Sequence, residues 1–158
     1  MPQLMRLVMA MRNIIESIIE KNKNYGIEVN APARLSDIFA FEQRVGFALP
    51  PDFIEFYTTC NGFGCIEDIF NLLSLAEITS YPDNYGTNWF YFAEYMIYSD
   101  MWGLRIGDTG KYEIFNGSYP AIAMTSSLEE FLNRFLKGNV FDEGGLYEWH
   151  DELQINRS

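Results

Sequence analysis

Residues 42–64 read EQRVGFALPPDFIEFYTTCNGFG and combine several helix-boundary signals in a short stretch. Gly46 is placed to end one helix, because glycine adopts the left-handed conformation without steric cost. Pro50 and Pro51 suit the entrance of the next helix, where a missing N–H costs little. Asn61-Gly62 supplies residues that tolerate the left-handed conformation at its end. These signals mark where helices begin and end, and no reaction chemistry is visible in the stretch.

Helical patterns lie on both sides of this stretch. The chain begins with a predicted helix over residues 4–21, whose apolar residues follow the spacing i, i+3, i+4 and i+7. Ser36 is a candidate N-cap for the helix that ends before residues 47–49. A last helix is predicted over 127–137, with either Ser126 or Ser127 as the first residue of a capping box. Residues 21–32 are polar and are predicted to form a connection.

Beyond residue 64 the pattern favours short strands instead of helices. The order of helices, then strands, then a helix predicts one α+β domain, residues 1–158, with a mainly antiparallel sheet of about four to six strands. N-terminal, central and C-terminal helices are expected to pack on this sheet. The candidate strands are 69–75, 89–98, 103–106, 112–115 and 121–124.

The aromatic segment 89–98 is the most distinctive of these strands. Alternate residues of a strand face opposite ways, so its rings cannot all enter one core. Two alternatives follow: the rings cover two packed faces, or some tyrosines are exposed beside carboxylates. One face is predicted to carry Trp89, Tyr91, Ala93, Tyr95 and Ile97. The other is predicted to carry Phe90, Phe92, Glu94, Met96 and Tyr98.

The charge is large and unevenly distributed. The net charge is −11 at pH 7, and residues 45–104 contain no Lys or Arg. Nucleic acid and anionic membranes are disfavoured as partners, because both are bound through Lys and Arg. A basic partner is favoured, with electrostatic steering that weakens as salt rises. The acidic residues of this segment are Asp52, Glu55, Glu67, Asp68, Glu77, Asp83, Glu94 and Asp100.

The cysteines and the single histidine do not specify a catalytic or metal site. Cys60 and Cys65 are too few for a disulfide framework and favour free thiols in a reducing cytoplasm. A zinc site would need two further ligands, and His150 is the only histidine. There are two catalytic alternatives: a cysteine nucleophile paired with His150, and acid–base catalysis by adjacent acidic residues. Neither set of residues has a spacing that is specific to catalysis. We therefore expect a cytoplasmic, non-enzymatic protein without a cofactor and without a membrane span.

Taken in order, these motifs resemble the SMI1/KNR4 family, also called the SUKH superfamily. Looser matches at 70–78, 92–100 and 127–136 extend the likeness over most of residues 35–137. The departures are a second proline at Pro51 and Gly64 after Phe63. The likeness rests on Phe41-Glu42, Gly46, Leu49-Pro50, Phe53 to Tyr57, and Asn61-Gly62.

This resemblance implies an α+β domain without known catalytic activity. Bacterial members are typically immunity proteins that neutralise a cognate toxin, frequently a nuclease, whereas fungal members are scaffolds in cell-wall signalling. Together with the charge, this predicts a stoichiometric complex with a toxin of basic surface, and a scaffold or regulatory domain is the alternative. Tyrosines beside acids are favoured as interface anchors for such a partner. The predicted binding residues are Tyr81, Asp83, Tyr85, Glu94 and Asp100, with Glu67 and Asp68 as secondary candidates.

Overall fold

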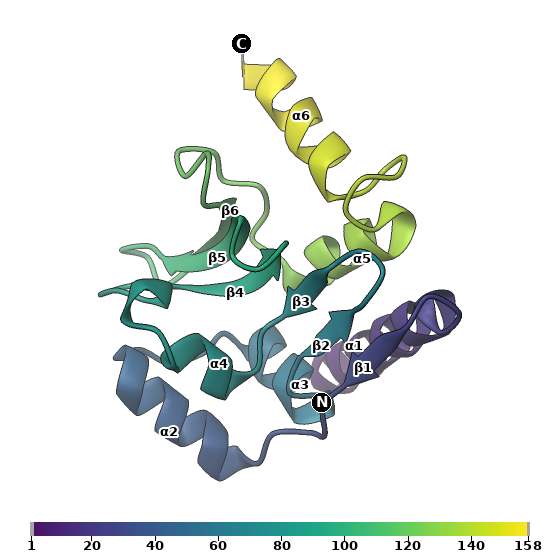
Figure 1. Cartoon of the computed structure of the whole chain (residues 1–158). Helices are drawn as coiled ribbons and strands as arrows, with labels where there is room; N and C mark the ends of the chain where they lie inside the picture. The colour runs from purple at the N-terminus through teal and green to yellow at the C-terminus, as the bar shows by residue number, and fades with distance from the viewer. Residues whose placement is uncertain (1, 158) are drawn as a thin grey trace.

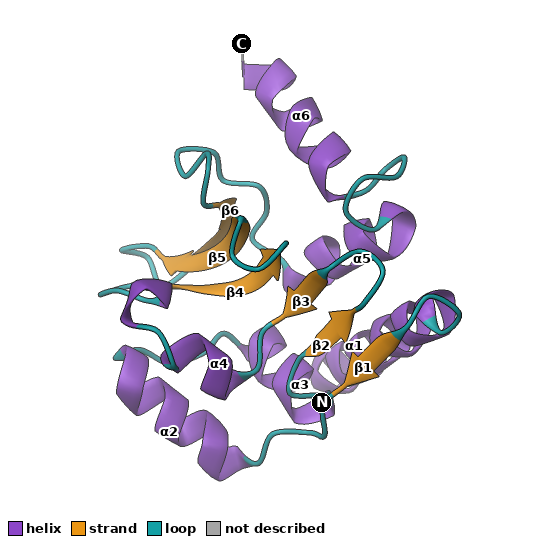
Figure 2. Ribbon diagram, viewed as in Figure 1, coloured by secondary structure: helices purple, strands orange, loops and turns teal. Residues whose placement is uncertain are grey.

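The structure is a computed structural model that describes the backbone of residues 2–157 and the side chains of residues 3 and 5–154. Within that part, six strands form one antiparallel sheet in the order β1-β2-β3-β4-β5-β6, drawn in orange in Figure 2. Each strand therefore pairs with its neighbour in the sequence. This arrangement confirms the predicted α+β class. The predicted domain also includes Met1 and Ser158, which lie outside the described residues.

The strands are short except in the centre of the sheet. They are β1 (Ile27–Val29), β2 (Phe63–Cys65), β3 (Phe70–Leu72), β4 (Trp89–Tyr95), β5 (Asp100–Ile106) and β6 (Tyr112–Asn116). The helices are α1 (Pro2–Asn22), α2 (Leu35–Val45), α3 (Pro51–Thr59), α4 (Leu75–Thr79), the 3₁₀ turn η1 (Pro82–Asn84), α5 (Leu128–Gly138) and α6 (Leu146–Arg157).

Helices α1, α3 and α5 contact one another and lie on one side of the sheet (Figure 1). Phe53 of α3 is fully buried there, with its ring against the rings of Phe92 and Tyr112 at 5.2 and 5.5 Å. Phe131 of α5 packs on Phe92 at 5.2 Å. These contacts identify the helix-covered face of the sheet, and the opposite face is called the outer face below.

The stretch 42–64 folds as its signals predict. Gly46 has φ +91° and ends α2, and Pro50 and Pro51 begin α3. The Glu42 carboxylate accepts the backbone N–H of Leu49 at 2.7 Å, which secures the corner between the two helices. After α3, the Asn61 side chain accepts the N–H of Leu75 at 3.0 Å. The motif therefore ties consecutive elements together.

Several predicted boundaries were wrong. Helix α2 begins at Leu35 after Arg34, so Ser36 is not its N-cap, and the Asp37 carboxylate accepts the Arg34 N–H at 2.9 Å. The polar connection 21–32 contains β1, and the acidic tail contains α6. Residues 121–124 form no strand, and the segment after β6 pairs with it through isolated bridges at Ile114–Thr125 and Asn116–Tyr119.

The predicted strands 69–75 and 89–98 both end earlier than expected. The first is β3 only to Leu72, because Ser74 caps α4 with its side chain accepting the Glu77 N–H at 3.1 Å. The second is β4 only to Tyr95, because the next residues form a turn. In α5, Ser127 is the N-cap and accepts the Glu130 N–H at 3.1 Å, so the second alternative gives the correct capping residue.

The predicted faces of residues 89–98 are confirmed as far as Phe92 and are wrong beyond it. The register between β4 and β5 shifts between Tyr91 and Ala93, so Phe92 is the extra residue of a β-bulge. Beyond this bulge the alternation inverts, and Ala93 faces the helices with Phe92. Glu94 consequently lies on the outer face, as Trp89 and Tyr91 do, and opposes Asn71 of β3. The bulge thus decides which acid of β4 reaches the outer face.

Candidate protein-interaction surface

Four side chains meet near the end of β4 on the outer face, and two of them, Tyr81 and Glu94, belong to the predicted binding set. They are Glu77 of α4, Tyr81 between α4 and η1, Glu94 of β4 and Tyr98 of the β4–β5 turn. The rings of Tyr81 and Tyr98 meet edge to face at 5.5 Å between centroids. Partial burial, followed by the charges of Glu94 and Glu77, raises the pKa of the Tyr98 phenol. We call these four residues, with Asp83 of η1, the acidic tyrosine cluster.

Glu94 is a buried member of the acidic tyrosine cluster. Its side chain is 6% exposed, and its two oxygens accept the Asn71 side-chain amide at 2.7 Å and the Tyr98 backbone N–H at 3.0 Å. A carboxylate that is enclosed in this way contributes a fixed negative charge and holds the turn. Its contribution to partner contact is therefore electrostatic and positional.

Tyr81 and Asp83 are the exposed members of the cluster. Tyr81 is 54% exposed, and Asp83 lies exposed in η1, where the Asn84 N–H returns to the Tyr81 carbonyl at 3.0 Å. Proline at the start of η1 restricts the backbone between them. The structure thus brings Tyr81, Asp83 and Glu94 of the predicted set into one region.

Asp100 lies at the same end of the sheet but on the other face. It pairs with Tyr95 across β4 and β5, whereas Glu94 pairs with Met101. Its carboxylate accepts the Asn116 amide at 3.1 Å and the hydroxyls of Ser118 and Tyr147. Burial, together with this hydrogen bond to Asp100, raises the pKa of Tyr147. Asp100 thus connects β5 to α6.

Tyr85 and the secondary candidates lie away from the cluster. The Tyr85 hydroxyl accepts a hydrogen bond from Arg44 Nε of α2 at 2.9 Å, and this bond raises the pKa of Arg44. Glu67 and Asp68 lie in the β2–β3 turn, beside a hollow of about 320 Å³ that Lys21 also lines. The Asp68 carboxylate accepts the Asn139 amide at 2.6 Å. The structure therefore divides the predicted set among four places.

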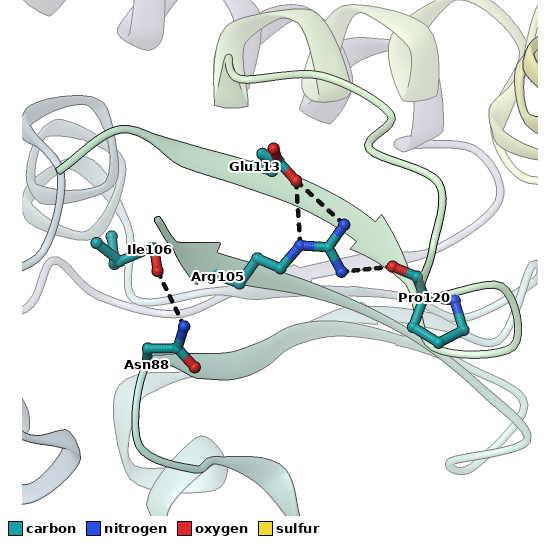
Figure 3. A network of polar contacts seen from close by, with 5 residues as sticks. All are labelled: Asn88, Arg105, Ile106, Glu113 and Pro120. Carbon is teal, nitrogen blue, oxygen red and sulfur yellow. Dashed lines mark hydrogen bonds and ion pairs between the residues drawn. The ribbon is translucent and has the colours of Figure 1, made fainter. Parts of the chain in front are cut away.

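A second feature of the outer face is an aromatic hollow at the opposite end of β4. It has a volume of about 270 Å³ and is lined by Asn88, Trp89, Tyr91, Arg105, Phe115 and Pro120. Figure 3 shows the Arg105 guanidinium between Glu113, at 3.1 Å, and the Pro120 carbonyl oxygen. The Asn88 side chain donates to the Ile106 carbonyl at 2.9 Å in the same view (Figure 3). Arg105 also lies over the Phe115 ring, so its charge is engaged within the molecule.

Sequence reasoning missed the contribution of the β4–β5 turn. Met96, Ile97 and Tyr98 look like a continuation of an apolar strand, and they contain no Gly, Asn or Pro to mark a turn. They nevertheless adopt positive φ values of 53°, 51° and 63°. The polar pair Ser99-Asp100 was the available signal for an interruption.

Neither a metal-binding group of side chains nor a membrane-spanning helix is found among the described residues. Among them, no group of three or more His, Cys, Asp or Glu side chains is arranged to hold a metal ion. Within residues 2–157, none of the helices combines the length and the hydropathy that crossing a bilayer requires.

The fold defines an α+β protein whose meandering antiparallel sheet is covered by helices on one face. The model of the SMI1 / KNR4 family (SUKH-1) matches residues 32–134, more than half of the chain, and the chain belongs to this family. This confirms the resemblance seen over residues 35–137. A comparison with curated proteins found no match.

Proposed function

We propose that this protein is an immunity protein, which binds a cognate bacterial toxin stoichiometrically and blocks it without catalysis. Membership of the SMI1 / KNR4 family (SUKH-1), which includes immunity proteins, supports this proposal. The observation that carries it is the acidic tyrosine cluster, which lies in a segment, residues 45–104, that contains no Lys or Arg. The proposed site of action is the cytoplasm.

The proposed mechanism is coverage of a basic substrate-binding face of the toxin, as a nuclease would present. Tyr81 supplies an exposed aromatic anchor, and Asp83 supplies an exposed carboxylate next to it. Tyrosine gives a large contact area at low entropic cost, and acids around it select Lys and Arg. Association is expected to be steered by charge and to weaken as salt rises.

Co-expression with the toxin gene next to the gene for this chain tests the proposal. We expect rescue of growth and a one-to-one complex in pull-down experiments. A double variant, Tyr81→Ala with Asp83→Lys, should weaken the complex by about tenfold or more. The matched control is Asp108→Lys, which makes the same charge change at an exposed position in the β5–β6 turn. Rescue that fails with the wild-type chain would contradict the immunity role.

A scaffold or regulatory interaction domain is the second candidate, since the family resemblance also implies that role. The neighbouring gene distinguishes the two, because a toxin gene directly upstream favours immunity. A partner that binds the acidic tyrosine cluster but has no toxic activity would favour the scaffold.

A further inference from the structure

Two turns at the end of the sheet lie side by side and expose large apolar side chains. The N–H of Met96, in the β4–β5 turn, donates to the carbonyl of Ile69, in the β2–β3 turn, at 2.9 Å. Ile69, Met96, Ile97 and Tyr98 are 45, 47, 80 and 40% exposed. We call these four residues the double-turn tip. It shares Tyr98 with the acidic tyrosine cluster.

The backbone of the double-turn tip is strained. All four residues have φ between 51° and 63°, and in the described part of the chain they are four of the five non-glycine residues with positive φ. This conformation brings Cβ close to the carbonyl oxygen, and a β-branched residue such as Ile69 or Ile97 is disfavoured most. Glycine or asparagine would adopt it more easily, so local folding does not require these isoleucines.

The strained conformation is held by hydrogen bonds. Besides the Glu94 carboxylate on the Tyr98 N–H, the Ser99 hydroxyl donates to the Met96 carbonyl at 2.7 Å. The Ser99 N–H donates to the Tyr95 and Met96 carbonyls at 3.1 and 3.2 Å. These hydrogen bonds therefore fix the conformation of the turn that exposes the apolar side chains. Side chains that are positioned before binding lose less entropy in a complex.

The charge around the double-turn tip indicates what can cover it. Exposed Glu67 and half-buried Asp68 precede Ile69, and the Glu94 carboxylate accepts the Tyr98 N–H of the β4–β5 turn. A phosphate backbone or an anionic membrane would be repelled by these acids, and a second copy of the tip would meet like charge. A protein surface with Lys or Arg around an apolar crevice matches both the charge and the exposed side chains.

We propose that the double-turn tip inserts into an apolar crevice on the partner protein, and that Lys and Arg side chains surround this crevice. The inference deepens the proposed function and rests on it, because the partner is the toxin. Ile97 is the central anchor, and Ile69 and Met96 contact the crevice walls. Strain is retained at these positions because it fixes the direction in which the isoleucines project.

The test compares Ile97→Asn and Ile69→Asn with the matched control Phe39→Asn, on an exposed phenylalanine of α2. The probe is a catalytically inactive variant of the protein encoded by the neighbouring toxin gene. Ile97→Asn should raise the thermal midpoint of this chain, since asparagine tolerates positive φ, and should weaken binding by about tenfold or more. Phe39→Asn should leave affinity unchanged. Unchanged affinity of Ile97→Asn in a complex that forms normally would overturn the inference and leave the immunity role intact.

A second probe makes the outcome independent of the toxin. If the wild-type chain does not bind the toxin, the proposed function fails, and a fluorescent peptide of alternating Lys and Leu then tests the tip. The wild-type chain should bind this peptide more weakly at high salt, and Ile97→Asn should lose about tenfold in affinity. Peptide binding that is absent or equal in the two chains would overturn the inference. Self-association of the wild-type chain that Ile97→Asn abolishes would overturn it in favour of a dimer.

Discussion

The Glu94 carboxylate and the backbone N–H of Tyr98, four residues further along the chain, are joined by a hydrogen bond of 3.0 Å. This bond links the outer face of the sheet to the turn that carries the exposed apolar residues. The same carboxylate accepts the Asn71 amide from β3. One buried acid thus connects β3, β4 and the β4–β5 turn.

Glu94→Ala should therefore destabilise the fold and loosen the turn. Loss of a charged acceptor that satisfies two partly buried donors is expected to lower the free energy of unfolding by about 1–3 kcal/mol. Hydrogen exchange at the Tyr98 amide should become faster. The matched control is Glu113→Ala, whose half-exposed carboxylate pairs with Arg105 and should contribute about 1 kcal/mol or less. Equal effects of the two substitutions in urea denaturation would contradict this account of Glu94.

Asp52, in the first turn of α3, joins three elements. Its carboxylate accepts the Tyr112 hydroxyl of β6 and the Leu128 N–H at the start of α5, the latter at 3.1 Å. Burial, followed by the charge of Asp52, raises the pKa of Tyr112, so the phenol remains a donor. Asp52→Ala should lower the free energy of unfolding by about 1.5–3 kcal/mol.

A double-mutant cycle with Tyr112→Phe separates the side-chain bond from the rest of this network. The Leu128 N–H also donates to the Tyr112 hydroxyl, at 2.8 Å. Tyr112→Phe alone should cost about 0.5–1.5 kcal/mol, since Asp52 still accepts this N–H. The two substitutions should be clearly non-additive in thermal unfolding. Additive costs would show that Asp52 and Tyr112 act independently.

Gly62 allows the segment that follows α3 to pass close to β3. Its φ is +88°, and a Cβ placed there would lie 2.4 Å from the Leu72 carbonyl oxygen. Gly62→Ala therefore adds backbone strain and a clash with the main chain, and should cost about 3 kcal/mol or more.

Gly46→Ala is the control for strain without a clash. Gly46 has φ +91°, and a Cβ placed there would have no neighbouring atom within 4 Å. This substitution should therefore cost only about 1–2 kcal/mol. The comparison is made by urea denaturation of the two variants. Similar costs would contradict the packing role of Gly62.

The cysteine thiols should be inert in the folded protein. Burial raises the pKa of Cys60 to about 11 and that of Cys65 to about 12. Because the thiolate is the nucleophile, Ellman's reagent at pH 8 should react slowly with the native chain and rapidly in urea. Rapid stoichiometric labelling without denaturant would contradict the buried placement.

His150 should make stability depend on pH below neutrality. It is 3% exposed beside the Tyr119 ring, and burial lowers its pKa despite the opposing charges of Asp151 and Asp100. In the unfolded chain its pKa is about 6.5, so the unfolded state binds more protons as the pH falls below this value. The free energy of unfolding should therefore be fully retained above about pH 6.5 and fall as the pH drops through the folded pKa.

Thermal unfolding of the wild-type chain and of His150→Gln between pH 7.5 and 5.5 measures this contribution. The interval lies above the range in which ordinary carboxyl groups titrate. The wild-type midpoint should fall more steeply than that of His150→Gln. Parallel slopes would show that His150 does not couple protonation to folding.

Local signals in the sequence determined helices α1, α2, α3 and α5 and the path of the central stretch, whereas α4 and α6 were not predicted. Glycine and proline restrict the backbone by their own covalent structure, so Gly46, Pro51 and Gly62 mark boundaries that the structure confirms. The ordered motifs also determined the family, and the composition determined the acidic segment 45–104.

Only the tertiary structure decided which residues share a surface. The bulge at Phe92 depends on pairing between β4 and β5, and it moves Glu94 to the outer face while Asp100 remains on the other. The segment Met96 to Tyr98 contains none of the residue types that favour positive φ. Its positive φ values are imposed by hydrogen bonds with Glu94, Ser99 and Ile69. One non-local hydrogen bond, from the Met96 N–H to the Ile69 carbonyl, acts together with local bonds to Glu94 and Ser99 and outweighs the backbone preference of these residues. A pattern of single residues does not contain that information.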